Sequence, residues 1–345
     1  PWALDWVMGL PESNAALAAH CCLRETLMPV RVLVPTSIVD DLTVRLRSSG
    51  ADYVDLVGFS DDAEHLSDSH ADVVVRWIAG ARFDELMDAS RTQWLHTASA
   101  GVDHVMVPAV LSHPDLILTD SGPAYGPSMA EFVITWMLAV THKVPQFLEM
   151  QKERHWEWVT HTEVSGSTVG IIGAGPVAQH IAQACKAVGC TVMLHRKRPI
   201  SVAGVDAVYS GLSGLMEMVP KVDWLIIACA MTPETTGIVN STVLAALRPG
   251  ARIINVARGG VVDQDELIRC LDTGKVSSAV LDVTTPEPLP QDSALWSHPN
   301  VHITCHSSAW TDGLRVRLLD LFVDNLRRYV SDEPLLNVVD FKRGY

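Results

Sequence analysis

A chain of 345 residues with 48% hydrophobic and 19% charged residues has the composition of a globular protein and the length of about two domains. Its net charge of −14 argues against nonspecific binding to nucleic acid or to an anionic membrane surface, because both favour basic protein faces. No apolar run reaches the roughly 20 residues of a membrane-spanning helix, so we expect neither a nucleic-acid nor a membrane partner.

The 7 cysteines are odd in number and scattered, a pattern typical of reduced thiols in a cytoplasmic protein. Residues 1–28 hold three acidic side chains against the single Arg24, which argues against a transit peptide, and we expect a poorly packed extension there. Beyond it, short apolar segments alternate with helical ones, which indicates parallel strands joined by crossover helices. The strands expected in the first part of the chain are Val30–Val34, Tyr53–Val57, Val73–Trp77, Trp94–Thr97 and Leu116–Thr119.

Two Gly-Pro pairs, Gly122-Pro123 and Gly126-Pro127, interrupt this pattern and predict a hinge. The segment from Ser128 to Glu131 has a capping-box pattern, which predicts a helix from Ser128 to about His142. This helix is apolar nearly all round, so we expect it to be buried on several sides, either in a core or against another subunit.

The stretch from Thr168 to Arg198 predicts a dinucleotide-binding unit of strand, glycine turn, helix and strand. In the turn, Gly173 permits the tight bend and Gly175 leaves room for a pyrophosphate. Ala178 is small enough for the helix to pack on the strand. The turn continues through Pro176 and Val177 into the helix, whose N-terminal N–H groups face the phosphates in such units. The alternative is an ordinary tight turn, because the glycine pattern alone is a weak signal.

Three polar residues follow the C-terminal ends of later strands, where open α/β sheets bind their ligands. They are Arg258, Glu287 and His306. Each residue alone could have a purely structural role: Arg258 as a helix-cap partner, Glu287 as a solvated charge and His306 as a hydrogen-bonded polar side chain. Together, at strand ends, they indicate a catalytic site. The strands expected here are Trp224–Ala228, Arg252–Val256, Ser278–Val283 and Val301–Thr304, and a long amphipathic helix is expected after Gly313, to about Val330.

Four motifs occur in order and resemble the D-isomer-specific 2-hydroxyacid dehydrogenase family from about residue 29 to 335. They are the glycine turn, Ala257-Arg258-Gly259-Gly260, the loop from Asp282-Val283 to Glu287-Pro288-Leu289-Pro290, and the late His306; the loop Ser99–Asp103 also matches. The resemblance implies an α/β fold with two Rossmann-like or flavodoxin-like domains, each a doubly wound parallel sheet, with a cleft between them. Residues 29–127 with 312–345 would bind the substrate, and residues 128–311 would bind the dinucleotide.

The resemblance also implies roles for individual residues. His306 would be the general acid that protonates the substrate carbonyl oxygen, and Glu287 would hold its imidazole in one tautomer and keep it protonated near neutral pH. Arg258 would bind the carboxylate of a 2-oxo acid. From the other domain, backbone N–H groups of Ala100, Gly101 and Val102 would bind the same carboxylate.

Further contacts are expected around the cofactor and the substrate. Asp282 resembles the family aspartate that contacts the nicotinamide, and Thr232 and Ala257 are further cofactor candidates. Trp310 is a candidate for substrate specificity. His298, His302 and His306 recur every four residues, but Pro299-Asn300 breaks any helix there, so we expect no metal site.

The turn after the second strand of the dinucleotide unit departs from the commonest family pattern. NAD-specific members place an aspartate about twenty residues past the glycines, whereas this chain has His195-Arg196-Lys197-Arg198. A 2′-phosphate attracts cations, and a guanidinium pairs with it in a fork. We therefore expect Arg196 and Arg198, beside His195, to favour NADP over NAD. The alternative is a solvated basic turn.

The chain most resembles the glyoxylate/hydroxypyruvate reductase branch. We therefore predict NADPH-dependent reduction of a small 2-oxo acid to the D-2-hydroxy acid, and the reverse oxidation, by a homodimer built around the helix Ser128–His142. One alternative is a phosphite- or formate-type dehydrogenase on the same scaffold, although the formate type replaces the histidine–glutamate pair. Another is a nucleotide-sensing protein like the co-repressors of this fold, which would need a partner-binding groove.

Overall fold

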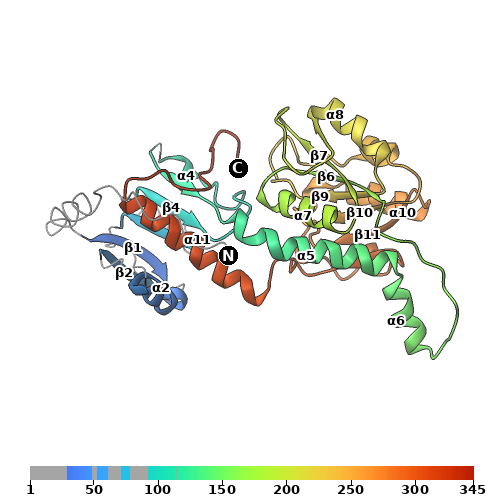
Figure 1. Ribbon diagram of the computed structural model, residues 1–345, viewed down its shortest axis with the longest axis horizontal. Coiled ribbons are helices and arrows are strands. Elements are labelled where there is room, and N and C mark those ends of the chain that lie inside the picture. Colours follow the sequence, from blue (N-terminus) through green and yellow to red (C-terminus); the bar gives the residue numbers. More distant parts are fainter. Residues whose placement is uncertain (1–28, 49–52, 61–70, 78–91, 114) are drawn as a thin grey trace, which may run out of the picture.

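The computed structural model describes residues 29–48, 53–60, 71–77, 92–113 and 115–345, so the predicted extension 1–28 lies outside the described residues. The described chain forms two lobes, each built on a parallel β-sheet, and the helix α5 (Gly122–Thr141) begins at the junction of the lobes and runs along the second (Figure 1). This confirms the predicted α/β class with two parallel sheets.

The sheet of the first lobe has the strand order β2-β1-β3-β4-β5, and every pair is parallel. Alternate residues of β1 enter different cores: Val32 and Val34 face the helices α2 and α11, whereas Leu33 packs on the other face. From α11, Phe322 stacks on Trp94 of β4 at 5.5 Å, so the long C-terminal helix returns to this lobe. The bounds are β1 Val30–Pro35, α2 Thr36–Ser48, β2 Val54–Phe59, β3 Val73–Arg76, β4 Trp94–Thr97, α4 Pro108–Leu111, β5 Ile117–Thr119 and α11 Asp312–Val330.

The sheet of the second lobe has the order β12-β11-β10-β9-β6-β7-β8, also parallel throughout. Its first strand in sequence, β6, lies between β7 and β9, so the strand order reverses at β6 and opens a crevice at its carboxyl end. The bounds are β6 Thr168–Ile172, α7 Pro176–Ala187, β7 Thr191–Arg196, β8 Ala207–Ser210, α8 Gly211–Met218, η1 Val219–Lys221, β9 Trp224–Ile227, α9 Ser241–Ala246, β10 Ala251–Asn255, η2 Gly259–Val261, α10 Gln264–Asp272, β11 Val276–Leu281, η3 Ala294–Trp296 and β12 Val301–Ile303.

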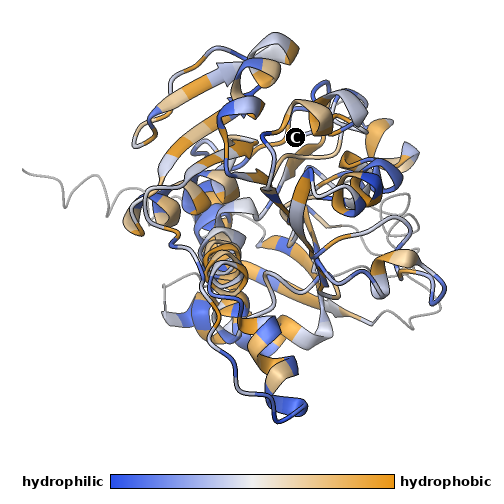
Figure 2. Cartoon of the chain, turned by 90° about the vertical axis from the view of Figure 1, so that its right-hand side faces the viewer, coloured by the Kyte–Doolittle hydropathy of each residue, from blue (hydrophilic) through white to orange (hydrophobic). Residues whose placement is uncertain are grey.

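The predicted strands are confirmed to within one or two residues at most ends, because they are the apolar segments that both sheets bury (Figure 2). The strand β8 was not expected. It lies at the edge of its sheet and its four residues are only partly buried, so its sequence has a weak apolar signal. The C-terminal helix is confirmed as α11, which begins at Asp312, slightly before the predicted start.

The predicted helix start at Ser128 is wrong. Helix α5 begins at Gly122 and runs through Pro127, and Ser128 is buried inside it, where its hydroxyl donates to the carbonyl of Tyr125 at 3.1 Å. The first Gly-Pro pair opens the helix instead of interrupting the chain, because a proline is tolerated in the first helical turn. Arg317 of α11 donates to the Ala124 carbonyl at 2.7 Å and stabilises the first turn of α5.

Helix α5 packs tightly on α7. A Cβ added at Gly126 would lie 2.3 Å from Nδ1 of His180, so the two backbones approach more closely than larger residues permit. Met129, Val133 and Met137 bury one face of the helix in the core. Helix α6 (Val144–Lys152) follows and projects from the body of the protein, with none of its residues buried (Figure 1).

A chain of hydrogen bonds lies buried where β4 and β5 end. Trp94 Nε1 donates to Thr119 Oγ1 at 2.8 Å, and this hydroxyl lies 2.8 Å from Nδ1 of His96. Nε2 of His96 lies 3.1 Å from the hydroxyl of Ser121, which donates to the carbonyl of Thr97 at 3.0 Å. Because the Ser121 hydroxyl donates its proton to Thr97, Nε2 of His96 carries a proton and donates to Ser121, and in the neutral ring Nδ1 accepts from Thr119. Burial agrees, since it lowers the pKa of His96 to about 3.

In the described part of the chain, no helix combines the length and hydrophobicity needed to cross a bilayer. The cysteines of the described residues are free thiols: Cys185, Cys190, Cys229, Cys270 and Cys305.

Candidate active site

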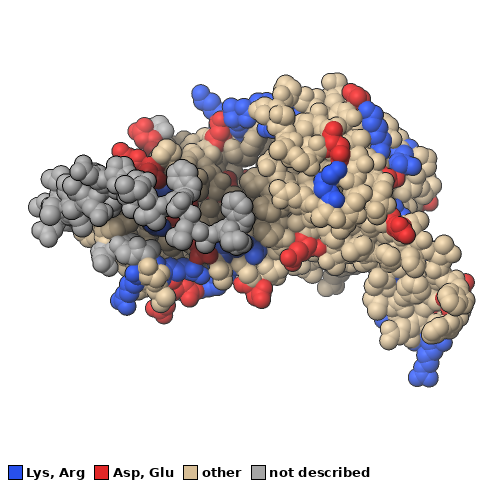
Figure 3. Space-filling view, in the orientation of Figure 1, with Lys and Arg blue, Asp and Glu red and all other residues tan. Residues whose placement is uncertain are grey.

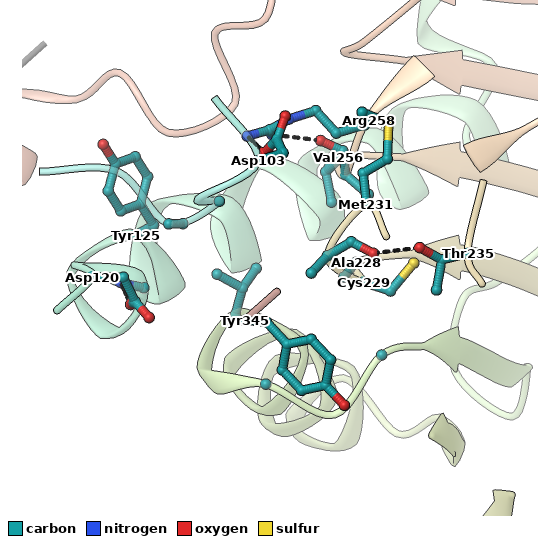
Figure 4. A pocket seen from close by; sticks show the side chains of 18 of the residues that line it. Asp103, Asp120, Tyr125, Ala228, Cys229, Met231, Thr235, Val256, Arg258 and Tyr345 are labelled. Carbon is teal, nitrogen blue, oxygen red and sulfur yellow. Dashed lines mark hydrogen bonds and ion pairs between the residues drawn. The ribbon is translucent and has the colours of Figure 1, made fainter. Parts of the chain in front are cut away.

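A cavity of about 1180 Å³ lies between the two lobes and is lined by residues from both (Figure 4). Its volume exceeds that of pockets for drug-sized ligands, which reach about 1,000 Å³. The second lobe contributes the carboxyl ends of its central strands, and the first lobe contributes loops after β3, β4 and β5. A dinucleotide together with a small second ligand fits a cavity of this size and placement.

The glycine turn forms one wall of the cavity. Gly173 has a φ of +126°, and a Cβ there would lie 2.4 Å from the backbone oxygen of Ala228, so only glycine fits. At Gly175 an added Cβ would meet nothing within 4 Å, which leaves open space beside the N-terminus of α7. Pro176 and Val177 line the cavity, and Ala178 is fully buried against the sheet. This cradle fits a pyrophosphate.

His306 and Glu287 form a hydrogen-bonded pair on the cavity wall. Nδ1 of His306 lies 2.9 Å from Oε2 of Glu287, and the backbone N–H of Thr284 donates to the other carboxylate oxygen at 3.0 Å. His306 has a φ of +50°, a conformation that a residue with a side chain adopts only when its surroundings impose it. Its N–H donates to the Asp282 carbonyl at 2.8 Å. The imidazole is therefore held at the end of β12. Glu287 binds Nδ1, so Nε2 is the ring nitrogen that can bind a ligand.

Asp282 lies beneath this loop and is not among the residues that line the cavity. Its carboxylate is 1% exposed and accepts hydrogen bonds from the hydroxyl of Thr304 at 2.6 Å and from the N–H groups of Ser307 and Ser308 at 2.8 and 3.1 Å. These contacts make it a positioning residue for the loop that carries His306.

Arg258 reaches across the cleft to a carboxylate of the first lobe. Its Nη2 and Nε donate to Asp103 at 3.0 and 3.3 Å, and its Nη1 donates to the Ala257 carbonyl at 2.9 Å (Figure 4). Burial alone would raise the pKa of Asp103, but a hydrogen bond with His104 and the charge of Arg258 lower it well below its usual range. The residue that we expected to bind a substrate carboxylate is therefore already paired with a carboxylate of the protein.

The loop Ser99–Asp103 packs directly on this arginine. A Cβ added at Gly101 would lie 2.3 Å from Nη2 of Arg258. The loop is held from within, because the hydroxyl of Ser99 donates to the Gly101 carbonyl at 2.9 Å. Ala100 and Gly101 line the cavity, whereas the Val102 side chain is buried in the core of the first lobe.

The basic turn, His195–Arg198, lines the cavity from the second lobe. Lys197 is paired with Glu234 at 2.9 Å, whereas Arg196 donates to the Ile200 carbonyl at 3.3 Å. His195 is 6% exposed and lies 3.0 Å from the Gly211 carbonyl, and its burial lowers its pKa. Lys and Arg side chains gather on the rim between the two lobes (Figure 3).

The remaining predicted contacts lie on the same cavity. Thr232 and Ala257 line it, and so does Trp310, which is 61% exposed. His298 and His302 do not: His302 stacks on Trp136 at 5.2 Å, and His298 lies 3.6 Å from Asp272. Among the described residues no group of His, Cys, Asp and Glu could hold a metal ion.

Several residues on the cavity were not expected from the sequence. Asp103 is part of the recognised Ser99–Asp103 loop, but its pairing with Arg258 was not foreseen. Asp120 is a half-buried carboxyl whose pKa is raised to about 6 by loss of hydration, and burial raises the pKa of Tyr125 to about 12. Tyr345, at the end of the chain, also lines the cavity. No local sequence pattern indicates that these last three residues meet the cleft.

Comparisons with known proteins agree with this geometry. The family model for the D-isomer specific 2-hydroxyacid dehydrogenase NAD binding domain matches residues 134–308. A glyoxylate/hydroxypyruvate reductase A from Serratia proteamaculans is 32% identical over 267 residues, which cover 75% of this chain and 84% of the relative. The human glyoxylate reductase/hydroxypyruvate reductase is 31% identical over 256 residues, covering 70% of this chain and 75% of that protein.

Solved structures are similar over nearly the whole chain. A D-isomer specific 2-hydroxyacid dehydrogenase from Xanthobacter autotrophicus Py2 in complex with NADPH and MES has a TM-score of 0.78 at 29% identity, covering 92% of this chain and 100% of that one. An NADPH-dependent glyoxylate/hydroxypyruvate reductase from Sinorhizobium meliloti, in complex with NADP and sulfate, has a TM-score of 0.78 at 27% identity, covering 91% and 99%. With the glycine turn, the His306–Glu287 pair and Arg258 on one cavity, the chain belongs to the D-isomer specific 2-hydroxyacid dehydrogenase family.

Proposed function

We propose that this protein reduces a small 2-oxo acid of the glyoxylate or hydroxypyruvate type to the D-2-hydroxy acid, with NADPH as the preferred cofactor, and catalyses the reverse oxidation. The observation that carries the proposal is that the His306–Glu287 pair and Arg258 face the same cavity as the glycine turn. The names of the reductases from Serratia proteamaculans and human support the substrate class.

The substrate carboxylate binds between the lobes in this proposal. Arg258 offers its guanidinium from the second lobe, and Ala100 and Gly101 line the cavity opposite it. The Asp103 carboxylate orients the guanidinium from the side through two hydrogen bonds. A planar fork of donors suits a carboxylate better than the single ammonium of a lysine.

His306 supplies the proton. Its Nδ1 donates to Glu287, so Nε2 is the ring nitrogen that donates to the carbonyl oxygen of the substrate. Glu287 stabilises the protonated imidazole and fixes its orientation, and the Thr284 N–H holds Glu287 in turn. The nicotinamide cofactor, when bound, supplies the hydride. Asp282 keeps the loop of His306 in place from below.

The cofactor preference rests on the basic turn. Lys197 is already neutralised by Glu234, so Arg196 and Arg198 are the cations that bind the 2′-phosphate. Each charged hydrogen bond is worth about 1.5–3 kcal/mol, so two favour NADPH over NADH by roughly a hundredfold or more. His195 and Thr232 border the same end of the cavity, and Gly173, Gly175, Pro176 and Val177 cradle the pyrophosphate.

Two measurements test this function. Steady-state kinetics with a panel of 2-oxo acids and NADPH, followed at the nicotinamide absorbance band, should detect turnover of glyoxylate or hydroxypyruvate. Absence of turnover with every 2-oxo acid would favour a nucleotide-sensing protein instead.

For the cofactor, kcat/KM is compared between NADPH and NADH in the wild type and the Arg196→Ala, Arg198→Ala double variant. Lys197→Ala is the matched control, because this cation is already paired. The preference for NADPH should collapse in the double variant and persist in the control. Equal efficiency with both cofactors in the wild type would refute the preference.

We also propose that residues 29–127 with 312–345 form the substrate domain and residues 128–311 the dinucleotide domain. The protein is further proposed to be a homodimer. Helix α6 and the segment after it expose large apolar side chains, with Leu148 53%, Trp156 90% and Trp158 94% exposed. On the face that Figure 3 shows, most of this projecting arm is uncharged. Exposed apolar surface of this extent is typical of a protein interface.

A further inference from the structure

The last residues of the chain, Val338–Tyr345, form an ordered segment along the first lobe, here called the strap. Val338 forms an antiparallel bridge with Thr119 of β5, and the N–H of Val339 donates to the Leu118 carbonyl at 2.8 Å. The Val339 side chain is 5% exposed in the core of this lobe. The segment after α11 is therefore fixed to the edge of the first sheet and moves with it.

A turn at Asp340 then sets the position of the final residues. The Asp340 carbonyl accepts from the N–H groups of Arg343 and Gly344 at 2.9 Å each, and the Asp340 N–H donates to the Tyr345 carbonyl at 3.1 Å. The Asp340 carboxylate also pairs with Arg343 at 3.0 Å. These contacts close the turn and place Tyr345 at its end, between the two lobes, where the chain ends (Figure 1).

Although the strap belongs to the first lobe, it reaches the second. A Cβ added at Gly344 would lie 3.8 Å from Cγ2 of Thr232, and Tyr345 lines the cavity (Figure 4). The hydrogen bond to Glu234 is the main reason that the pKa of Lys197 is raised, but Tyr345 raises it further. The end of the strap, Gly344 with Tyr345, is therefore close to both Thr232 and the basic turn.

Those two segments identify the part of the cofactor that Tyr345 faces. The basic turn follows β7, and Thr232 lies in the loop after β9, on the opposite side of β6. In a dinucleotide-binding unit the pyrophosphate lies at the glycine turn after β6, and the ribose next to the turn after the following strand. The space between the basic turn and Thr232 therefore receives the adenosine half of the nucleotide.

We propose that Tyr345 is a nucleotide-binding residue, whose ring covers the adenosine half of the cofactor from the substrate lobe. The inference rests on the proposed nucleotide site. It means that the cofactor is held by both lobes, since the glycine turn grips it from one and the strap covers it from the other. An aromatic ring can stack on a base without specific hydrogen bonds, because both present flat π-faces.

The test measures binding of cofactor fragments to the full-length protein by calorimetry. Tyr345→Ala should weaken the binding of 2′,5′-ADP and of NADPH by about 5- to 30-fold, the lower part of the range for one aromatic–base contact, because the side chain is 44% exposed. Tyr345→Phe should bind within about twofold of the wild type, since it keeps the ring. Lys342→Ala, an exposed strap residue that does not line the cavity, is the matched control and should also bind normally.

The result separates this inference from the proposed cofactor preference. If the wild type binds 5′-AMP as tightly as 2′,5′-ADP, the preference for NADP fails, but the loss in Tyr345→Ala is still measured with 5′-AMP. Binding in Tyr345→Ala within twofold of the wild type, for every fragment, would overturn the role of the ring. So would an equal loss in Tyr345→Phe, which would assign the contact to the hydroxyl.

Discussion

Replacing Gly101 by alanine should disable the site without unfolding the protein. The new Cβ would lie 2.3 Å from Nη2 of Arg258 and 3.0 Å from Oδ1 of Asp103. The loop is held by the hydrogen bond from Ser99 and by the buried Val102, whereas the guanidinium is the end of a flexible side chain. The arginine is therefore the group that moves.

The size of the effect follows from this geometry. Ordinary carbon–nitrogen contacts begin near 3.4 Å, so Nη2 has to withdraw by about 1 Å. Its hydrogen bond to Asp103, now 3.0 Å, is then lost or redirected. A misplacement of about 1 Å at a binding group costs roughly a hundredfold in rate. We expect kcat/KM for the 2-oxo acid to fall by about that factor.

The assay is steady-state kinetics with NADPH and glyoxylate or hydroxypyruvate, together with thermal unfolding. Gly260→Ala is the matched control, because its Cβ would make only ordinary contacts, the nearest being Met231 Sδ at 3.4 Å. The control should retain activity, and both variants should unfold within a few degrees of the wild type. Gly101→Ala with normal kcat/KM would show that the position of Arg258 does not limit the reaction.

The other predictions concern catalysis, stability and assembly. His306→Ala should lower kcat by roughly 10²–10⁴-fold, the usual contribution of a positioned acid, and near-normal turnover would remove it from the mechanism. Gly173→Ala should destabilise the fold and abolish NADPH binding in calorimetry, because the methyl group would lie 2.4 Å from backbone; a stable variant that binds would contradict the close approach. His96 titrates near pH 6.5 when unfolded but only near 3 when folded, so its contribution to the free energy of unfolding is complete above pH 6.5 and decreases as the pH falls toward 3. In denaturant titrations this group should lower the free energy of unfolding by about 2 kcal/mol between pH 7 and pH 5, and His96→Gln should not show this contribution. Light scattering should give about twice the 37.6 kDa of one chain, and a clean monomer at micromolar concentration would refute the homodimer.

Much of the architecture could be predicted because it follows from short-range pattern. Buried parallel strands are continuous apolar segments, and ligand-binding residues follow their carboxyl ends, so Arg258, Glu287 and His306 could be located from the sequence. The pairing of His306 with Glu287 was also expected, and the structure has it at 2.9 Å.

What could not be predicted depends on contacts between segments far apart in the chain. Asp103 and Arg258 are separated by 155 positions, and only the packing of one lobe against the other brings them together. Tyr345 reaches the cavity because β5 provides an edge for the strap. The start of α5 was placed too late because the two Gly-Pro pairs look like breaks, whereas Pro123 falls in the first helical turn, where a missing N–H costs little.

The ion pair between Asp103 and Arg258 has one partner on each lobe, and this gives ionic strength two opposite effects on turnover. Opening the cleft separates the two charges, and dissolved salt stabilises the separated ions, so release of the hydroxy acid should become faster as salt is added. The same salt weakens attraction of a phosphorylated cofactor to the half-buried Arg196 and the exposed Arg198 of the basic turn. Where opening of the cleft limits turnover, the rate at saturating NADPH should therefore rise with salt, while the apparent affinity for NADPH falls.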